Sequence, residues 1–125
     1  MKLNHVFTIW AVIMFIFGLV FLLAPEVLLT RGGNPPSPGE IGLGRLLGGF
    51  HLGFAVLAWL ARSITETSAR RKIVVSVLVL LIVNLLVFLK ATLIDGRTTV
   101  ADWFNVILVA VFVCIYGYFY ITKRE

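Results

Sequence analysis

The chain has 125 residues, of which 60% are hydrophobic and 14% charged, and its formal net charge is +5 at pH 7. Soluble domains contain about 25% charged residues, so this composition excludes a protein whose surface faces water throughout. The basic residues lie in short segments between apolar runs, which favours membrane loops over a nucleic-acid interface. The lone Cys114 excludes an intramolecular disulfide framework and a thiolate metal cage, and we interpret it as a small hydrophobic residue of a packed helix.

Four apolar stretches are long enough to cross a bilayer, whose core of about 30 Å needs about 20 helical residues. The first, 6–24, carries no charge, and it is predicted to be a retained span because it exceeds a signal-peptide core and no A-x-A-like site follows it. The other three are 41–61, 73–94 and 103–121. We therefore predict one all-α membrane domain, residues 1–125, with four transmembrane helices in an up-down-up-down antiparallel bundle.

Helix-boundary signals accompany these spans. Residues 37–40, Ser-Pro-Gly-Glu, have the form of a capping box before the second span, and residues 99–102, Thr-Val-Ala-Asp, form a second candidate before the fourth. Asp95-Gly96 predicts the end of the third helix. Pro25-Glu26 predicts a brief interfacial helix over 27–30, followed by a stiff return.

The distribution of charge predicts that both termini are cytoplasmic, because cytoplasmic loops carry the excess of Lys and Arg. On that side lie seven cations against Glu66 and Glu125, namely Lys2, Arg62, Arg70, Arg71, Lys72, Lys123 and Arg124. On the outer side four cations face four acids, namely Arg31, Arg45, Lys90 and Arg97 against Glu26, Glu40, Asp95 and Asp102.

Ionisable residues inside the spans are candidate functional residues, because burying them in a membrane is costly. Arg45 and Lys90 each lie about 6 Å inside the outer end of a span at 1.5 Å per residue. With Glu40, Asp95 and Asp102 they are predicted to form a ring of opposite charges at the outer mouth. The alternatives are a structural ion-pair network with a snorkelling Lys90, or an anion or headgroup site at Arg45 near a helix N-terminus.

Two polar residues fall near the bilayer midplane. His51 and Asn84 each lie about 15 Å from the ends of their spans. The simplest interpretation is a hydrogen bond between the two helices. The alternatives are a polar contact to a buried lipid, quinone or pigment, or an axial ligand of a haem or chlorin, for which a lone His is weak evidence.

Glycine is concentrated in the second span. Gly44-xxx-Gly48 and Gly49-xxx-Gly53 both have the spacing that lets transmembrane helices approach closely, so they are predicted packing residues. No hydrolase, P-loop, zinc-protease or dinucleotide motif is present, so no catalytic residue, metal site or cofactor is predicted.

The first half of the chain resembles small bacterial four-helix membrane proteins that are related in plan to the DoxX-like proteins. The resemblance rests on residues 22–26, Leu-Leu-Ala-Pro-Glu, on residues 44–49, Gly-Arg-Leu-Leu-Gly-Gly, with Gly53, and on residues 58–62, Ala-Trp-Leu-Ala-Arg. It implies a bacterial inner-membrane protein and supplies no activity to carry over. The second half matches only in hydropathy.

These observations favour a non-enzymatic accessory or structural subunit that packs against a larger membrane complex or against itself. A binder of a lipophilic small molecule at Arg45, His51 and Asn84 is the alternative. A small oligomeric transporter comes third, because the inner half of every span lacks an ionisable residue. The expected partners are membrane lipids and other membrane subunits, with no nucleic acid.

Overall fold

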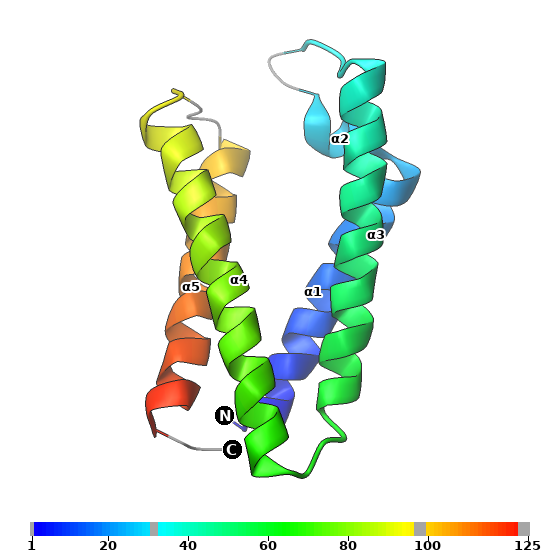
Figure 1. Cartoon of the computed structure of the whole chain (residues 1–125). Helices are drawn as coiled ribbons and strands as arrows, with labels where there is room; N and C mark the ends of the chain where they lie inside the picture. Colours follow the sequence, from blue (N-terminus) through cyan, green and yellow to red (C-terminus); the bar gives the residue numbers. More distant parts are fainter. Residues whose placement is uncertain (1, 31–32, 97–99, 123–125) are drawn as a thin grey trace. The chain divides into compact units, whose positions relative to one another are not determined.

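The computed structural model describes residues 2–30, 33–96 and 100–122, and this part of the chain is all-helical (Figure 1). Four of the helices in it are long and apolar enough to cross a membrane. They contain between 21 and 27 residues, which corresponds to about 30 to 40 Å at 1.5 Å per residue. The predicted fold class is confirmed at this level, whereas the order of crossing and the side of each terminus stay predictions.

The chain divides into two compact units, one over residues 3–63 and the other over residues 64–125. The first unit contains α1 (Leu3–Leu23), α2 (Pro25–Leu29) and α3 (Pro38–Ala61). The second contains α4 (Thr67–Leu93) and α5 (Val100–Thr122). Within each unit the two long helices run antiparallel, side by side (Figure 1). The predicted single domain over 1–125 stays a prediction.

Proline separates α1 from α2. A residue that precedes proline is disfavoured in the helical region, and Ala24 accordingly adopts φ −142° and ψ 60° before Pro25 opens α2. This short helix covers Pro25–Leu29, close to the predicted 27–30, and ends where the Thr30 backbone N–H and hydroxyl both donate to the Glu26 carbonyl, at 3.0 and 2.7 Å. The chain thereby turns back towards α3.

The predicted capping box at the start of α3 is confirmed. The Glu40 backbone N–H donates to the Ser37 hydroxyl oxygen at 3.3 Å, and the Ser37 backbone N–H donates to the Glu40 carboxylate at 2.7 Å. Two otherwise unsatisfied N–H groups are thus bonded, with Pro38 at the first helical position. The start of α3 is fixed by these three residues.

Glycine brings α1 and α3 into close contact. A Cβ atom added at Gly48 would lie 2.8 Å from the Leu22 backbone nitrogen and 2.9 Å from the Gly18 carbonyl oxygen. A Cβ added at Gly18 would lie 2.8 Å from the Leu52 side chain. The helix backbones therefore meet here without a layer of side chains between them, as small residues allow in membranes.

The second unit pairs α4 with α5. α4 begins at Thr67, six residues before the predicted span at Ile73, because the apolar run marks only the hydrocarbon segment while Ala, Arg and Lys extend the helix. It ends at Leu93, and Gly96 adopts φ +70°, in agreement with the predicted stop. Thr99, the predicted cap of the fourth span, lies outside the described residues. Buried apolar residues on the two helices include Val77, Leu81, Phe112 and Tyr116.

Candidate functional site

His51 lies half-buried on α3 beside two aromatic rings of α1. The ring centroids of Phe21 and Phe17 lie 5.5 and 6.4 Å from the imidazole centroid. The His51 Nδ1–H donates to the Leu47 carbonyl one turn earlier, at 2.7 Å. In the neutral ring Nε2 is then an acceptor, so the imidazole presents a lone pair in an aromatic setting.

Asn84, the predicted partner of His51, belongs to α4 and therefore to the other unit, where it is half-buried. The hydrogen bond between these side chains stays a prediction.

The charged residues at the start of α3 have separate roles within the first unit. Glu40 closes the capping box with Ser37, so its carboxylate binds the backbone and the hydroxyl of that serine. Arg45 lies about one and a half turns further along α3 and is exposed, whereas Gly44 and Gly48 on the packed face are buried. Arg45 is therefore available to an external anion or headgroup, as an anion or headgroup site at this residue would require.

The other members of the predicted charge ring lie in the second unit. The Lys90 ammonium lies 3.5 Å from the Asp95 carboxylate, and both side chains are exposed to solvent. Exposed pairs of this kind stabilise a fold by about 0–1 kcal/mol. Asp102 lies in the first turn of α5, where a carboxylate interacts favourably with the helix dipole. A ring that includes Arg45 joins residues of both units and stays a prediction.

The predicted packing glycines divide between two faces of α3. Gly44 and Gly48 are buried against the first part of the unit, where added Cβ atoms would meet Leu29, Pro25 and the α1 backbone. Gly49 and Gly53 lie on the face turned away from α1, and no atom lies within 4 Å of an added Cβ. Gly42 has the same open surroundings. Of the two predicted pairs, Gly44–Gly48 is the one that takes part in close packing within the first unit.

The open face of α3 is continuous and apolar. Gly42, Gly49 and Gly53 follow the spacing i, i+7, i+11, which places them on one side of a helix. The same side carries the exposed residues Leu46, Val56 and Leu60. We call these six residues the glycine face.

Sequence reasoning missed two contacts between a cation and an aromatic ring, one in each unit. The Arg62 guanidinium lies over the Trp59 ring, with its central carbon 3.4 Å from the ring centroid, and it donates to the Thr8 hydroxyl of α1 at 3.3 Å. In the other unit the central carbon of Arg71 lies 5.2 Å from the Tyr120 ring centroid. Trp59 and Arg62 are three residues apart at the end of α3, a spacing that could have indicated their contact. Arg71 and Tyr120 belong to different helices, and nothing in the sequence pairs them.

The described residues contain no group of three His, Cys, Asp or Glu side chains that could hold a metal ion. Cys114 is exposed on α5.

Four helices of spanning length, with large apolar residues exposed along all of them, are typical of multi-pass membrane proteins. Residues 1–123 match the model of a family described as Domain of unknown function (DUF8292), and the chain belongs to this family. No curated protein and no solved structure matches it. The resemblance to the DoxX-like proteins stays a prediction.

Proposed function

We propose that the protein is a non-enzymatic subunit of a larger assembly in the bacterial cytoplasmic membrane. The observation that carries this proposal is the glycine face of α3. Lipid tails are as apolar as leucine, so helices in a bilayer associate through close packing of small residues. α3 already uses Gly44 and Gly48 in this way against its own unit. The glycine face offers the same chemistry to a second surface.

The proposed orientation places both termini in the cytoplasm, with the four helices crossing in alternate directions. Seven basic residues then lie inside and four outside, in agreement with the positive-inside rule. Of these charges, Arg31, Arg97, Lys123 and Arg124 lie outside the described residues, and so does Glu125. The described part alone still places Arg62, Arg70, Arg71 and Lys72 around one connection.

A second candidate function is the binding of a lipophilic small molecule at His51. The imidazole donates through Nδ1 to its own helix, which leaves Nε2 as an acceptor beside Phe17 and Phe21. A quinone or pigment with a hydroxyl or N–H group would find a hydrogen-bond acceptor and aromatic contacts there. This function would not require the glycine face.

One experiment separates the two functions. The chain would be extracted gently from its native membrane as wild type and as the double variant Gly49→Leu/Gly53→Leu, and each would be weighed by native mass spectrometry. We expect the wild type to carry a stoichiometric protein partner or further copies of itself. We expect the double variant to lose them, because two leucine side chains hold an approaching helix away.

Gly117→Leu is the matched control, because Gly117 lies on α5 and also has open space around its Cβ position. An assembly that is unchanged in the double variant would refute a role for the glycine face. A lone chain carrying a small apolar adduct that disappears in His51→Ala would support the second candidate in place of the first.

A further inference from the structure

The start of α4 carries three consecutive cations, Arg70, Arg71 and Lys72, immediately before the apolar run that begins at Ile73. We call these three residues the basic collar. Successive residues of a helix point about 100° apart, so three in a row cover more than half of its circumference. The basic collar therefore covers more than one face of the helix directly beside the apolar run, where a membrane span would meet the headgroups.

Two cations of the basic collar are not neutralised within the described chain. Neither Arg71 nor Lys72 takes part in an ion pair among the described residues, and both are exposed. The nearby Glu66 accepts a hydrogen bond from the Ser68 hydroxyl. Its carboxylate is the only acidic group among residues 63–72, so the collar keeps a net positive charge.

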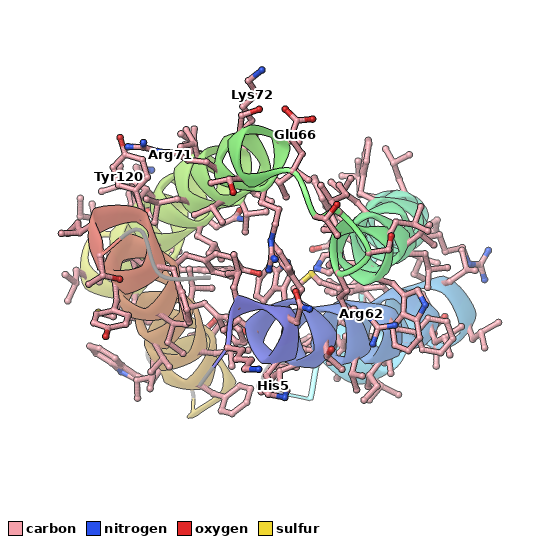
Figure 2. All side chains as sticks on the ribbon, turned by 90° about the horizontal axis from the view of Figure 1, so that it is seen from below. His5, Arg62, Glu66, Arg71, Lys72 and Tyr120 are labelled. Atoms are coloured by element: carbon pink, nitrogen blue, oxygen red, sulfur yellow. The ribbon has the colours of Figure 1, made fainter. Side chains whose placement is uncertain are left out.

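The collar occupies the fourth to sixth residues of α4, just beyond the first turn, where the helix dipole acts most strongly. Glu66, the residue before α4, is the acidic group nearest to this end of the helix. One carboxylate therefore stands beside three cations. Figure 2 shows Lys72 projecting outward from α4, away from the rest of its unit.

Arg71 is positioned by its aromatic neighbour. The Tyr120 ring of α5 lies under the guanidinium, with 5.2 Å between the central carbon of Arg71 and the ring centroid (Figure 2). A cation–π contact of this kind uses no N–H···O hydrogen bond, so the donors of the guanidinium stay available to the oxygen atoms of a phosphate. Arg62 differs, because its Nε and one terminal nitrogen already donate to Trp59 and Thr8.

We propose that the basic collar is a binding surface for anionic phospholipid headgroups, with Arg71 and Lys72 contacting the phosphate. Clusters of basic residues beside a transmembrane segment attract anionic lipids, and each Lys or Arg raises the affinity about fivefold. The collar adjoins the apolar run, so in a membrane it would lie level with the lipid phosphates. A soluble protein partner would have to approach the membrane surface to reach it. The inference does not depend on the proposed subunit role.

The test is a lipid competition. The full chain in neutral detergent would be titrated with phosphatidylglycerol and with phosphatidylcholine of the same acyl chains, and bound lipid would be counted by native mass spectrometry. We expect a preference for phosphatidylglycerol. The preference should fall about fivefold for Arg71→Gln or Lys72→Gln, and towards the phosphatidylcholine level for Arg70→Gln/Arg71→Gln/Lys72→Gln.

Lys90→Gln is the matched control, because Lys90 is an exposed cation of the same helix that already pairs with Asp95, and we expect it to keep the wild-type preference. The charge-conserving Arg71→Lys should keep most of it. Equal binding of the two lipids by the wild type would overturn the proposal, and so would an unchanged preference in the single variants. Displacement of the lipid by inorganic phosphate at equal concentration would show a free-phosphate site and would also overturn it.

Discussion

Gly48 and Gly49 are neighbours in the sequence with opposite surroundings. The position of a Cβ at Gly48 is occupied by the backbone of α1, at 2.8 Å from Leu22 and 2.9 Å from Gly18, whereas no atom lies within 4 Å at Gly49. Backbone atoms cannot rotate aside as a flexible side chain can. The same substitution should therefore have different consequences at the two positions.

We predict that Gly48→Ala destabilises the pairing of α1 and α3 by about 1–3 kcal/mol, because the helices must separate to accept the methyl group. Gly49→Ala should be neutral or slightly stabilising, because alanine is the better helix former. The free energy of unfolding in mixed micelles, followed by far-UV circular dichroism, would measure both. Equal effects of the two variants would contradict the close approach.

Single residues show where sequence reasoning reaches its limit. The spacing of Gly44 and Gly48 indicated close packing, and both glycines lie against their own unit. The identical spacing of Gly49 and Gly53 did not distinguish an internal contact from an open face. Gly18 was overlooked, although a glycine within an unbroken apolar span is itself a signal of close approach.

At the scale of the element, the capping box of α3 links sequence to structure most directly. Ser37 and Glu40 bond to each other's backbone at 3.3 and 2.7 Å, and they begin the helix that carries both glycine pairs. The Glu40 N–H has no carbonyl partner within the helix, so removal of the Ser37 hydroxyl leaves it without its capping acceptor. The first turn of α3 should then fray.

We predict that Ser37→Ala lowers the free energy of unfolding by about 1 kcal/mol. Ser76→Ala is the control, since the Ser76 hydroxyl donates to the Lys72 carbonyl inside α4 and caps no helix end, and it should change stability by less than roughly 0.5 kcal/mol. Amide exchange at Glu40 and Ile41 would locate the change. Unaltered exchange there would show that the box does not hold the helix end.

Element boundaries were predictable where local chemistry sets them. Pro25, the Ser37–Glu40 box and Asp95-Gly96 act through their own backbones, and the structure ends or begins helices at or next to them. The start of α4 was placed six residues late because hydropathy ignores helix formation outside the membrane. No side chain caps α4 at Glu66, so no local motif marked its start.

At the scale of the whole molecule, the number of apolar runs and their lengths follow from the bilayer and needed no tertiary information. The candidate site did not follow in the same way. His51 gained two aromatic neighbours and Arg62 gained Thr8 through contacts between α1 and α3 that sequence separation conceals. Helical periodicity shows on which side of its helix a residue lies. Which residues it meets there depends on how the helices pack, and the sequence does not show this.

The proposed topology predicts that the connections on the two sides of α3 lie on opposite sides of the membrane. In a Cys114→Ala background, Asn34→Cys should react with a membrane-impermeant thiol reagent added to spheroplasts. Ser68→Cys should react only after permeabilisation, because it lies next to the basic collar on the proposed cytoplasmic side. Both native residues are exposed.

Labelling of the two cysteines from the same side would show that α3 does not cross the bilayer. The reverse pattern, with Ser68→Cys labelled in intact spheroplasts, would keep the spans and invert the orientation. A reagent that crosses membranes should label both variants equally, which controls for the reactivity of each thiol.

The contact between Gly18 and Gly48 has a mechanical consequence. Where the backbones of two helices touch, the contact can act as a pivot about which the angle between the helices changes, and in this unit the pivot lies at the two glycines. A helix longer than the local hydrocarbon thickness adjusts by tilting. We therefore expect a change in bilayer thickness to change the crossing angle of α1 and α3, while the distance between the two helices at the glycines stays constant.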